Sequence, residues 1–164
     1  SIRRQRQMCI RDSVYPEYVG DLGFEPIHIL DFLADKLSRG VIEFKDSEKN
    51  VVTYHDPCRL GRMAGIYDAP RRLIEALPGL EFKEMIRSRE NGVCCGTSGW
   101  MNCSSCSKDI QMQRLGEAMD IGANTLITAC PKCQIHFRCA KAAYPLDIEI
   151  TDLYDLVAGR LKKT

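Results

Sequence analysis

The amino-acid sequence predicts an α/β fold in which helices flank a parallel sheet. Two observations predict it: short β-rich runs alternate with amphipathic stretches along the chain, and each amphipathic stretch is long enough to be a helix. Parallel strands need crossover connections of about a dozen residues or more, usually helices, so this alternation indicates βαβ units. With 164 residues, the chain is long enough to form one such domain around a buried core.

The first 45 residues are predicted to differ from the rest of the chain. Residues 1–13 carry four arginines and no apolar periodicity, which predicts a non-native or disordered arm. Within residues 14–45, the apolar run Ile27–Leu30 is expected to form a short strand. Asp31 is then expected to cap a helix that runs to about Ser38.

Residues 46–164 are predicted to hold a complete set of alternating elements. Val51–His55 is rich in β-branched and aromatic residues, which is typical of a strand. A helix is expected over residues 69–77, with Pro70 in its first turn. Leu80–Ile86 is expected to form the second strand of this region.

The alternation continues to the end of the chain and predicts a Rossmann-like sheet. The expected elements are a helix over 108–121, a central strand over 125–129, a helix from Cys130 to about Ala143, a strand over 148–150 and a final helix, capped by Thr151, to about Leu161. In such parallel sheets, binding sites form where strands end and helices begin.

Charge and composition exclude several classes of protein. Lys and Arg number 23 against 22 Asp and Glu, so the net charge of +1 gives no electrostatic case for a nucleic-acid partner. The sequence contains no apolar run of about 18 residues, so no membrane span is predicted. Nine cysteines without a signal peptide indicate a reducing cytoplasm, where clustered cysteines favour metal or redox chemistry over disulfides.

Five cysteines form the most informative pattern: 35 residues separate Cys58 from the adjacent pair Cys94-Cys95, and 34 separate that pair from Cys130-Pro-Lys-Cys133. Two adjacent cysteines are hard to place on one tetrahedral ion, whereas a cluster of several irons can use all five. Cys58 and Cys130 each follow a predicted strand, so the carboxyl edge of a parallel sheet is expected to bring them together.

Local features of these segments favour metal binding. Cys130 and Cys133 begin a predicted helix, where the positive end of the helix dipole favours the thiolate that binds metals. Gly96 directly follows the cysteine pair and is expected to let the backbone pass close to a bulky inorganic group.

A faint internal repeat indicates a longer protein. The segments 15–33 and 144–154 both read as a Tyr-Pro pair, a short strand, a cap and a helix. The first copy has no C-x2-C helix before it. Residues 14–45 are therefore expected to be the tail of a preceding repeat, and the chain a fragment.

The sequence resembles the cysteine-rich CCG domain family over roughly residues 14–164. The resemblance rests on three motifs: His55-Asp-Pro-Cys58, Arg89-Glu-Asn91 ahead of Cys94-Cys95-Gly96, and Thr128-Ala-Cys-Pro-Lys-Cys133. This family includes the catalytic subunits of heterodisulfide reductase and iron–sulfur subunits of glycolate, lactate and glycerol-3-phosphate oxidation systems. Its members usually carry two such domains, so residues 46–164 would be one complete CCG repeat.

The resemblance implies a redox function. It implies a non-cubane [4Fe-4S] cluster whose ligands would be Cys58, Cys94, Cys95, Cys130 and Cys133. It also implies electron delivery from ferredoxin-like iron–sulfur and flavin subunits, and a small thiol or disulfide as the substrate. Electrons would pass through the cluster to a disulfide or a similar two-electron acceptor.

Cys103 and Cys106 leave alternatives open. They lie where many family members have a Gly-rich loop, and they fit extra ligands, resolving thiols or buried small residues. With Cys130-x2-Cys133 they approach the spacing of a structural zinc site. The Cys130-x2-Cys133 segment alone also fits a thiol–disulfide exchange protein. Both alternatives leave the other three cysteines of the pattern unexplained.

Residues near Cys58 also allow two interpretations each. His55 fits either a hydrogen-bond donor to a cluster sulfur or a structural histidine at a strand end. Nearby arginines fit either contacts to an anionic substrate or acidic electron-donor protein, or ordinary surface charge. These arginines are Arg59, Arg62, Arg71 and Arg72.

Overall fold

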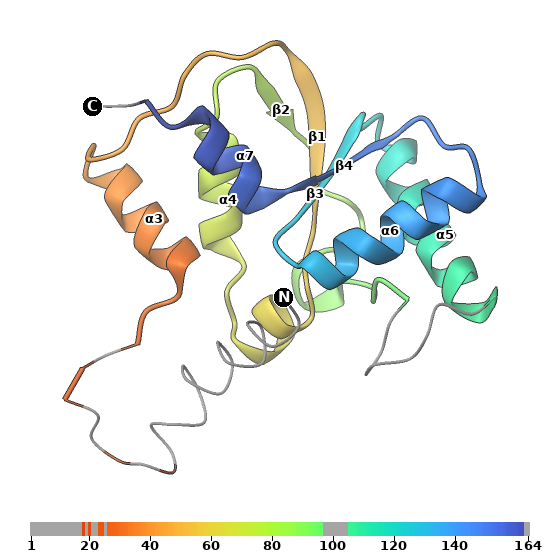
Figure 1. Cartoon of the computed structure of the whole chain (residues 1–164), viewed down its shortest axis with the longest axis horizontal. Coiled ribbons are helices and arrows are strands. Elements are labelled where there is room, and N and C mark those ends of the chain that lie inside the picture. Colours follow the sequence, from red (N-terminus) through yellow and green to blue (C-terminus); the bar gives the residue numbers. More distant parts are fainter. Residues whose placement is uncertain (1–17, 19, 21–22, 25, 97–104, 163–164) are drawn as a thin grey trace.

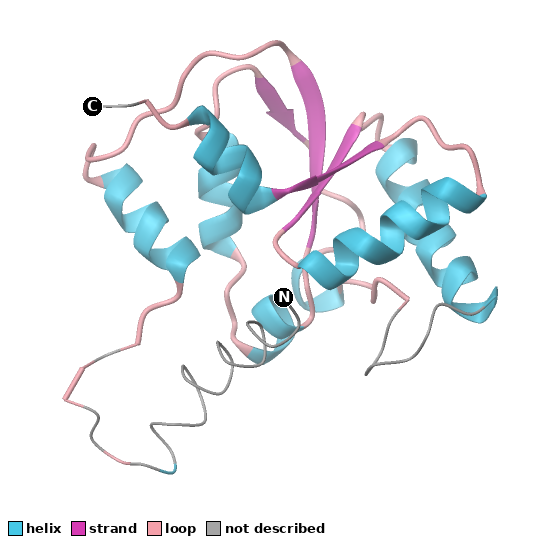
Figure 2. Ribbon diagram, viewed as in Figure 1, coloured by secondary structure: helices cyan, strands magenta, loops and turns pink. Residues whose placement is uncertain are grey.

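A four-stranded parallel sheet forms the centre of the computed structural model, which describes residues 18, 20, 23–24, 26–96 and 105–162. The strands are β1 (Asn50–His55), β2 (Leu80–Phe82), β3 (Thr125–Thr128) and β4 (Glu149–Asp152), and their order is β2-β1-β3-β4. Figures 1 and 2 show this sheet between two groups of helices. The predicted α/β fold is confirmed, and β3 is a central strand as predicted.

Helices cover both faces of the sheet. Three of them lie over one face: α3 (Ile29–Ser38), α4 (Asp68–Glu75) and α7 (Leu153–Arg160) (Figure 1). The other face carries α5 (Ser105–Asp120) and α6 (Pro131–Ala143). Neighbouring strand residues point to opposite faces, so Ile127 belongs to the first core and Leu126 to the second. Among the described helices, none combines the length and apolar character that crossing a bilayer requires.

The strand predicted over Ile27–Leu30 is wrong, because α3 already begins at Ile29. His28 caps this helix: its Nδ1 accepts a hydrogen bond from the Leu30 N–H at 3.2 Å. The helix therefore starts before Asp31, the predicted cap. Leu30 and Ala34 then pack in the same core as α4 and α7. The predicted arm over residues 1–13 lies outside the described residues.

The second strand is shorter than predicted. Lys83 still donates its N–H to the Val52 carbonyl at 2.8 Å, but β2 itself ends at Phe82. Beyond it, Glu84 forms an ion pair with Arg71 of α4, and Met85 is buried on the opposite side of the sheet. These contacts take the chain out of the strand before Ile86.

The last helix is capped by Asp152, not by Thr151. The Asp152 carboxylate accepts hydrogen bonds from the Tyr154 and Asp155 N–H groups at 2.8 and 3.4 Å. Thr151 lies within β4, opposite Ile127 of β3. Both residue types cap helices well, so the sequence alone did not separate them.

Candidate metal centre

Two of the predicted ligand segments leave neighbouring strands at the same edge of the sheet. β1 pairs in parallel with β3, and His55 lies opposite Thr128 at the carboxyl ends. Cys58 follows β1 as the residue before the short π-helix η2 (Arg59–Met63). Cys130 follows β3 as the N-cap residue of α6. The parallel pairing thus places both cysteines at one edge, as the sequence pattern predicts.

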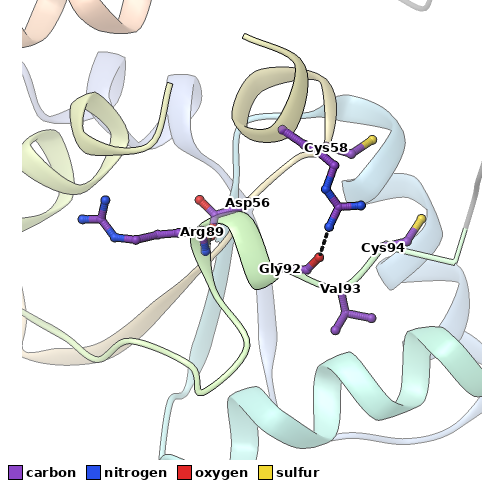
Figure 3. A pocket seen from close by; sticks show the side chains of 7 residues that line it. Asp56, Cys58, Arg89, Gly92, Val93 and Cys94 are labelled. Atoms are coloured by element: carbon purple, nitrogen blue, oxygen red, sulfur yellow. Dashed lines mark hydrogen bonds between the residues drawn. The ribbon is translucent and has the colours of Figure 1, made fainter. Parts of the chain in front are cut away.

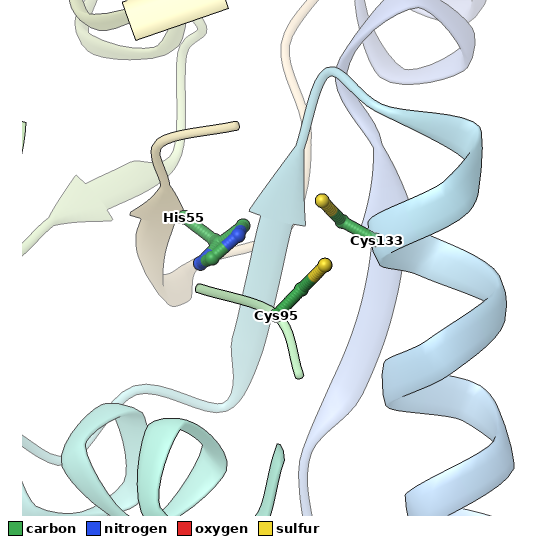
Figure 4. A group of neighbouring side chains, drawn as sticks. All are labelled: His55, Cys95 and Cys133. Atoms are coloured by element: carbon green, nitrogen blue, oxygen red, sulfur yellow. The ribbon is translucent and has the colours of Figure 1, made fainter. Parts of the chain in front are cut away.

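Cys95 is the centre of the buried side of the site. Its sulfur, the Cys133 sulfur and a ring nitrogen of His55 all lie within 4.8 Å of one another (Figure 4). Cys95 forms side-chain hydrogen bonds with Cys133, Cys94 and His55. Cys133 also forms a hydrogen bond with Cys130. Four of the five cysteines are therefore linked by direct contacts.

Cys58 and Cys94 form the open side of the site. They line a small pocket of about 30 Å³, with room for one or two water-sized groups, and their sulfurs lie on the same side of it (Figure 3). Cys58 is exposed and Cys94 is half-buried, whereas Cys95, Cys130 and Cys133 are buried. Cys58 interacts electrostatically with Cys95 and Cys130. The fold therefore brings together all five cysteines from three segments of the chain.

The thiols of this group have different proton affinities. Hydrogen bonds from Cys133 and Cys94 hold the pKa of Cys95 far below its usual range. Cys133 keeps its proton, because its hydrogen bonds to Cys130 and Cys95 raise its pKa. Burial raises the pKa of Cys58, with a further increase from the nearby Cys95 and Cys130. The low pKa of Cys95 makes this side chain a thiolate, the form that binds metals.

This donor set fits a group of several irons. Cys94 and Cys95 are adjacent, yet Cys95 contacts the buried Cys133 while Cys94 lines the open pocket beside Cys58. Five sulfurs exceed what one tetrahedral zinc ion binds, and thiolates are the usual ligands of iron–sulfur clusters. Cys106 is exposed in the first turn of α5 and takes no part in the contacts above. Cys103 and Cys9 lie outside the described residues.

Position 96 requires glycine, because the backbone is left-handed there and helix α5 lies close to it. The Gly96 φ of +79° lies in the left-handed region, which disfavours other residues. A Cβ atom at this position would lie 2.5 Å from the Ser107 carbonyl oxygen and 2.9 Å from Gln111 Cγ. The close approach seen at this glycine is thus between the Cys94-Cys95 segment and helix α5.

Replacing Gly96 by alanine is expected to displace this segment. The left-handed backbone alone costs about 1–3 kcal/mol for a residue with a side chain, and the contact with α5 adds to that cost. Thermal unfolding of the apo-protein measures the loss. The matched control is Gly116→Ala, because Gly116 lies within α5 and has open space around it. Equal stability of the two variants would contradict the role of Gly96.

The sequence did not reveal two buried polar residues of α5. Gln111 and Arg114 are both fully buried, on the same face as Leu115 and Ala118. Gln111 pairs with His136 across a distance of 3.3 Å between Nε2 and Nδ1. Arg114 donates from Nε to His55 Nδ1 at 3.2 Å. Positions 111, 114, 115 and 118 have the spacing of one helix face. This spacing, and not the polar residue types, was the sequence signal that Gln111 and Arg114 are buried.

Arg71 is not one of the surface charges that flank Cys58. It is buried and forms ion pairs with Asp56, two residues before Cys58, and with Glu84. Arg72, its neighbour on α4, is exposed. Arg62 is also exposed, lines the pocket, and donates to the carbonyls of Glu90 and Gly92 at 3.3 and 3.1 Å. Of the four arginines considered near Cys58, Arg62 is the one that lines the pocket.

Comparisons with known proteins agree with the cysteine pattern. A family model described as CCG, cysteine-rich domain, matches residues 52–138, more than half of the chain. One relative is a component of the dihydromethanophenazine:CoB–CoM heterodisulfide reductase of Methanosarcina barkeri. The chain is 37% identical to it over 150 residues, covering 90% of this chain and 37% of that protein.

Two other relatives belong to different redox systems. One is the probable iron-sulfur-binding oxidoreductase FadF of Bacillus subtilis, 35% identical over 118 residues, with 69% of this chain and 17% of that protein covered. The other is a component of the fumarate reductase (CoM/CoB) of Methanothermobacter marburgensis, 31% identical over 147 residues, with 87% and 28% covered. The chain thus spans well under half the length of each of these relatives.

Proposed function

The chain belongs to the cysteine-rich CCG domain family, and on this premise we propose that it is the iron–sulfur redox part of a larger oxidoreductase. One observation carries the proposal: five cysteines from three chain segments converge at the carboxyl edge of the sheet. The relatives named above support it, because they include a heterodisulfide reductase component and an iron-sulfur-binding oxidoreductase.

The proposed cofactor is a non-cubane [4Fe-4S] cluster held by Cys58, Cys94, Cys95, Cys130 and Cys133. When bound, such a cluster supplies one-electron transfer steps beside a sulfur substrate. The protein contributes a dry inner wall, because Cys95, Cys130 and Cys133 are buried. It also contributes an open side at Cys58 and Cys94, where the small pocket meets solvent.

The proposed reaction is the reduction of a disulfide. Two electrons and two protons convert R–S–S–R′ into the thiols R–SH and R′–SH, and the sulfur–sulfur bond breaks. Ferredoxin-like iron–sulfur and flavin subunits would deliver the electrons. The substrate would approach the exposed Cys58, and Arg62 lines the same pocket with a positive charge. The name of the heterodisulfide reductase relative is consistent with this substrate class.

The test is a count of iron and acid-labile sulfide in the anaerobically purified chain. About four irons and four sulfides per chain are expected, with a brown colour and a paramagnetic signal after thiol is added to the oxidised protein. Zinc without sulfide, in a colourless protein, would overturn the proposal. It would favour a mononuclear site, for which the His55–Cys95–Cys133 group provides three closely spaced ligands.

A further inference from the structure

A fully buried arginine lies behind the candidate cluster site. Arg114 of α5 has no exposed side-chain surface. Its Nη1 donates to the Arg87 carbonyl at 2.6 Å and to Glu117 at 2.5 Å, and its Nε donates to His55 Nδ1 at 3.2 Å. Among the described residues, its Nη2 has no hydrogen-bond partner. Burying a charge with incomplete pairing is costly, so an arginine at this position calls for an explanation.

The contact with Arg114 determines which nitrogen of His55 carries the proton. A guanidinium group has five N–H donors and no acceptor, so His55 Nδ1 must accept and cannot hold a proton. The proton of the neutral ring then lies on Nε2. His55 is 1% exposed, and Phe137 packs edge-on against its ring with centroids 4.8 Å apart. This packing holds the plane of the ring.

A ring nitrogen of His55 lies within 4.8 Å of the Cys95 sulfur, and the two side chains form a hydrogen bond (Figure 4). Because Nδ1 is occupied by Arg114, the nitrogen left to donate to the Cys95 sulfur is Nε2. The contacts thus form a continuous series: Glu117 to Arg114, Arg114 to His55, and His55 to Cys95. The series ends at Cys95, which is the most central of the five cysteines.

We propose that Glu117, Arg114 and His55 form a relay that directs an N–H group at the Cys95 sulfur and raises the reduction potential of the cluster. This inference rests on the proposed function. Reduction adds negative charge to the cluster and its sulfurs, and hydrogen bonds to those sulfurs stabilise the reduced form. Arg114 is a positioning residue, since it acts on Cys95 through the His55 ring.

The first measurement needs no cluster. Nitrogen NMR of the histidine side chains in the full apo-chain, which has only three histidines, is expected to show His55 with its proton on Nε2. In Arg114→Met this single tautomer is expected to give way to a mixture. The matched control is Arg87→Gln, because Arg87 pairs with the same Glu117 but is exposed and donates nothing to His55.

The second measurement is the reduction potential of the iron-loaded chain. His55→Phe and Arg114→Met are expected to make reduction at least tenfold less favourable, a decrease of about 59 mV for a one-electron couple. Arg87→Gln is expected to change the potential by much less. His55→Phe keeps an aromatic ring next to Phe137 but removes the donor, so it decides the question even if Arg114→Met does not fold.

The outcomes separate this inference from the proposed function. Unchanged potentials in both iron-loaded variants would overturn the relay while leaving the cluster in place. A wild-type His55 that carries its proton on Nδ1 would overturn the relay with or without iron. A wild-type chain that binds no iron and sulfide would instead overturn the proposed function, and with it the effect on the potential.

Discussion

Cys95→Ser is expected to lose essentially all iron and acid-labile sulfide, together with electron transfer to any acceptor. Cys95 is 4% exposed and joins the two halves of the site, because its side chain contacts Cys133 and Cys94 directly. Its low pKa makes Cys95 a thiolate, whereas a serine hydroxyl stays protonated and is a poor ligand for iron in a cluster. Metal and sulfide analysis of the anaerobically reconstituted protein measures the loss.

The control for this experiment is Cys139→Ser. Cys139 lies on α6 like Cys133, but its side chain is exposed and contacts Lys108 rather than the site. Iron and sulfide in this variant are expected to match the wild type. Full iron, sulfide and activity in Cys95→Ser would contradict the five-ligand assignment. The same comparison with Cys106→Ser tests the extra ligand that the sequence pattern left open.

The sheet edge where the cysteines lie together was predictable, because the strand and the helix that meet there have strong local sequence signals. The β3 residues Thr125–Thr128 are all buried, as expected for a strand covered on both faces, and Pro131 begins α6 directly after it. The short run Ile27–Leu30 lacked such a signal, since a few apolar residues fit a strand and a helix start equally well. In the structure, His28 caps the helix, and the segment therefore begins α3 instead of forming a strand.

The buried charges were not predictable, because their partners are distant in the sequence. Arg114 contacts His55 across 59 positions, and Arg71 contacts Asp56 across 15. A single sequence shows only that these residues are arginines, and arginines are mostly found at protein surfaces. Both arginines contact residues of the segment that leads to Cys58. The sequence therefore revealed the cysteine ligands, but not the buried arginines that position this segment.

Arg71→Met is expected to lower the free energy of unfolding by about 3–5 kcal/mol, the usual cost of removing one partner from a buried ion pair. Arg71 contacts both Asp56 oxygens, at 2.8 and 2.9 Å, and the two side chains are 5% and 3% exposed. Hydrogen bonds from Arg71 and the Arg89 N–H outweigh burial and lower the pKa of Asp56. Without Arg71, this carboxylate stays buried with too few donors.

The consequence extends to the metal centre, because Asp56 joins the segments that carry its ligands. Asp56 lies between β1 and Cys58, and its Oδ2 accepts the Arg89 N–H at 2.8 Å, five residues before Cys94. Arg89 has a φ of +55°, a left-handed conformation that costs energy in a non-glycine residue and that this hydrogen bond helps to hold. Arg71→Met is therefore expected to weaken iron retention as well as stability.

Chemical denaturation of the apo-protein separates the ion pair from other effects of the substitution. Arg72→Met is the matched control, because Arg72 is the next residue of α4 and is exposed, so its stability is expected to change by no more than about 0.5 kcal/mol. In a double-mutant cycle, Asp56→Asn combined with Arg71→Met is expected to cost less than the sum of the two single changes, since no unpaired buried charge remains. An Arg71→Met protein as stable as Arg72→Met would show that the pair does not hold the two ligand segments together.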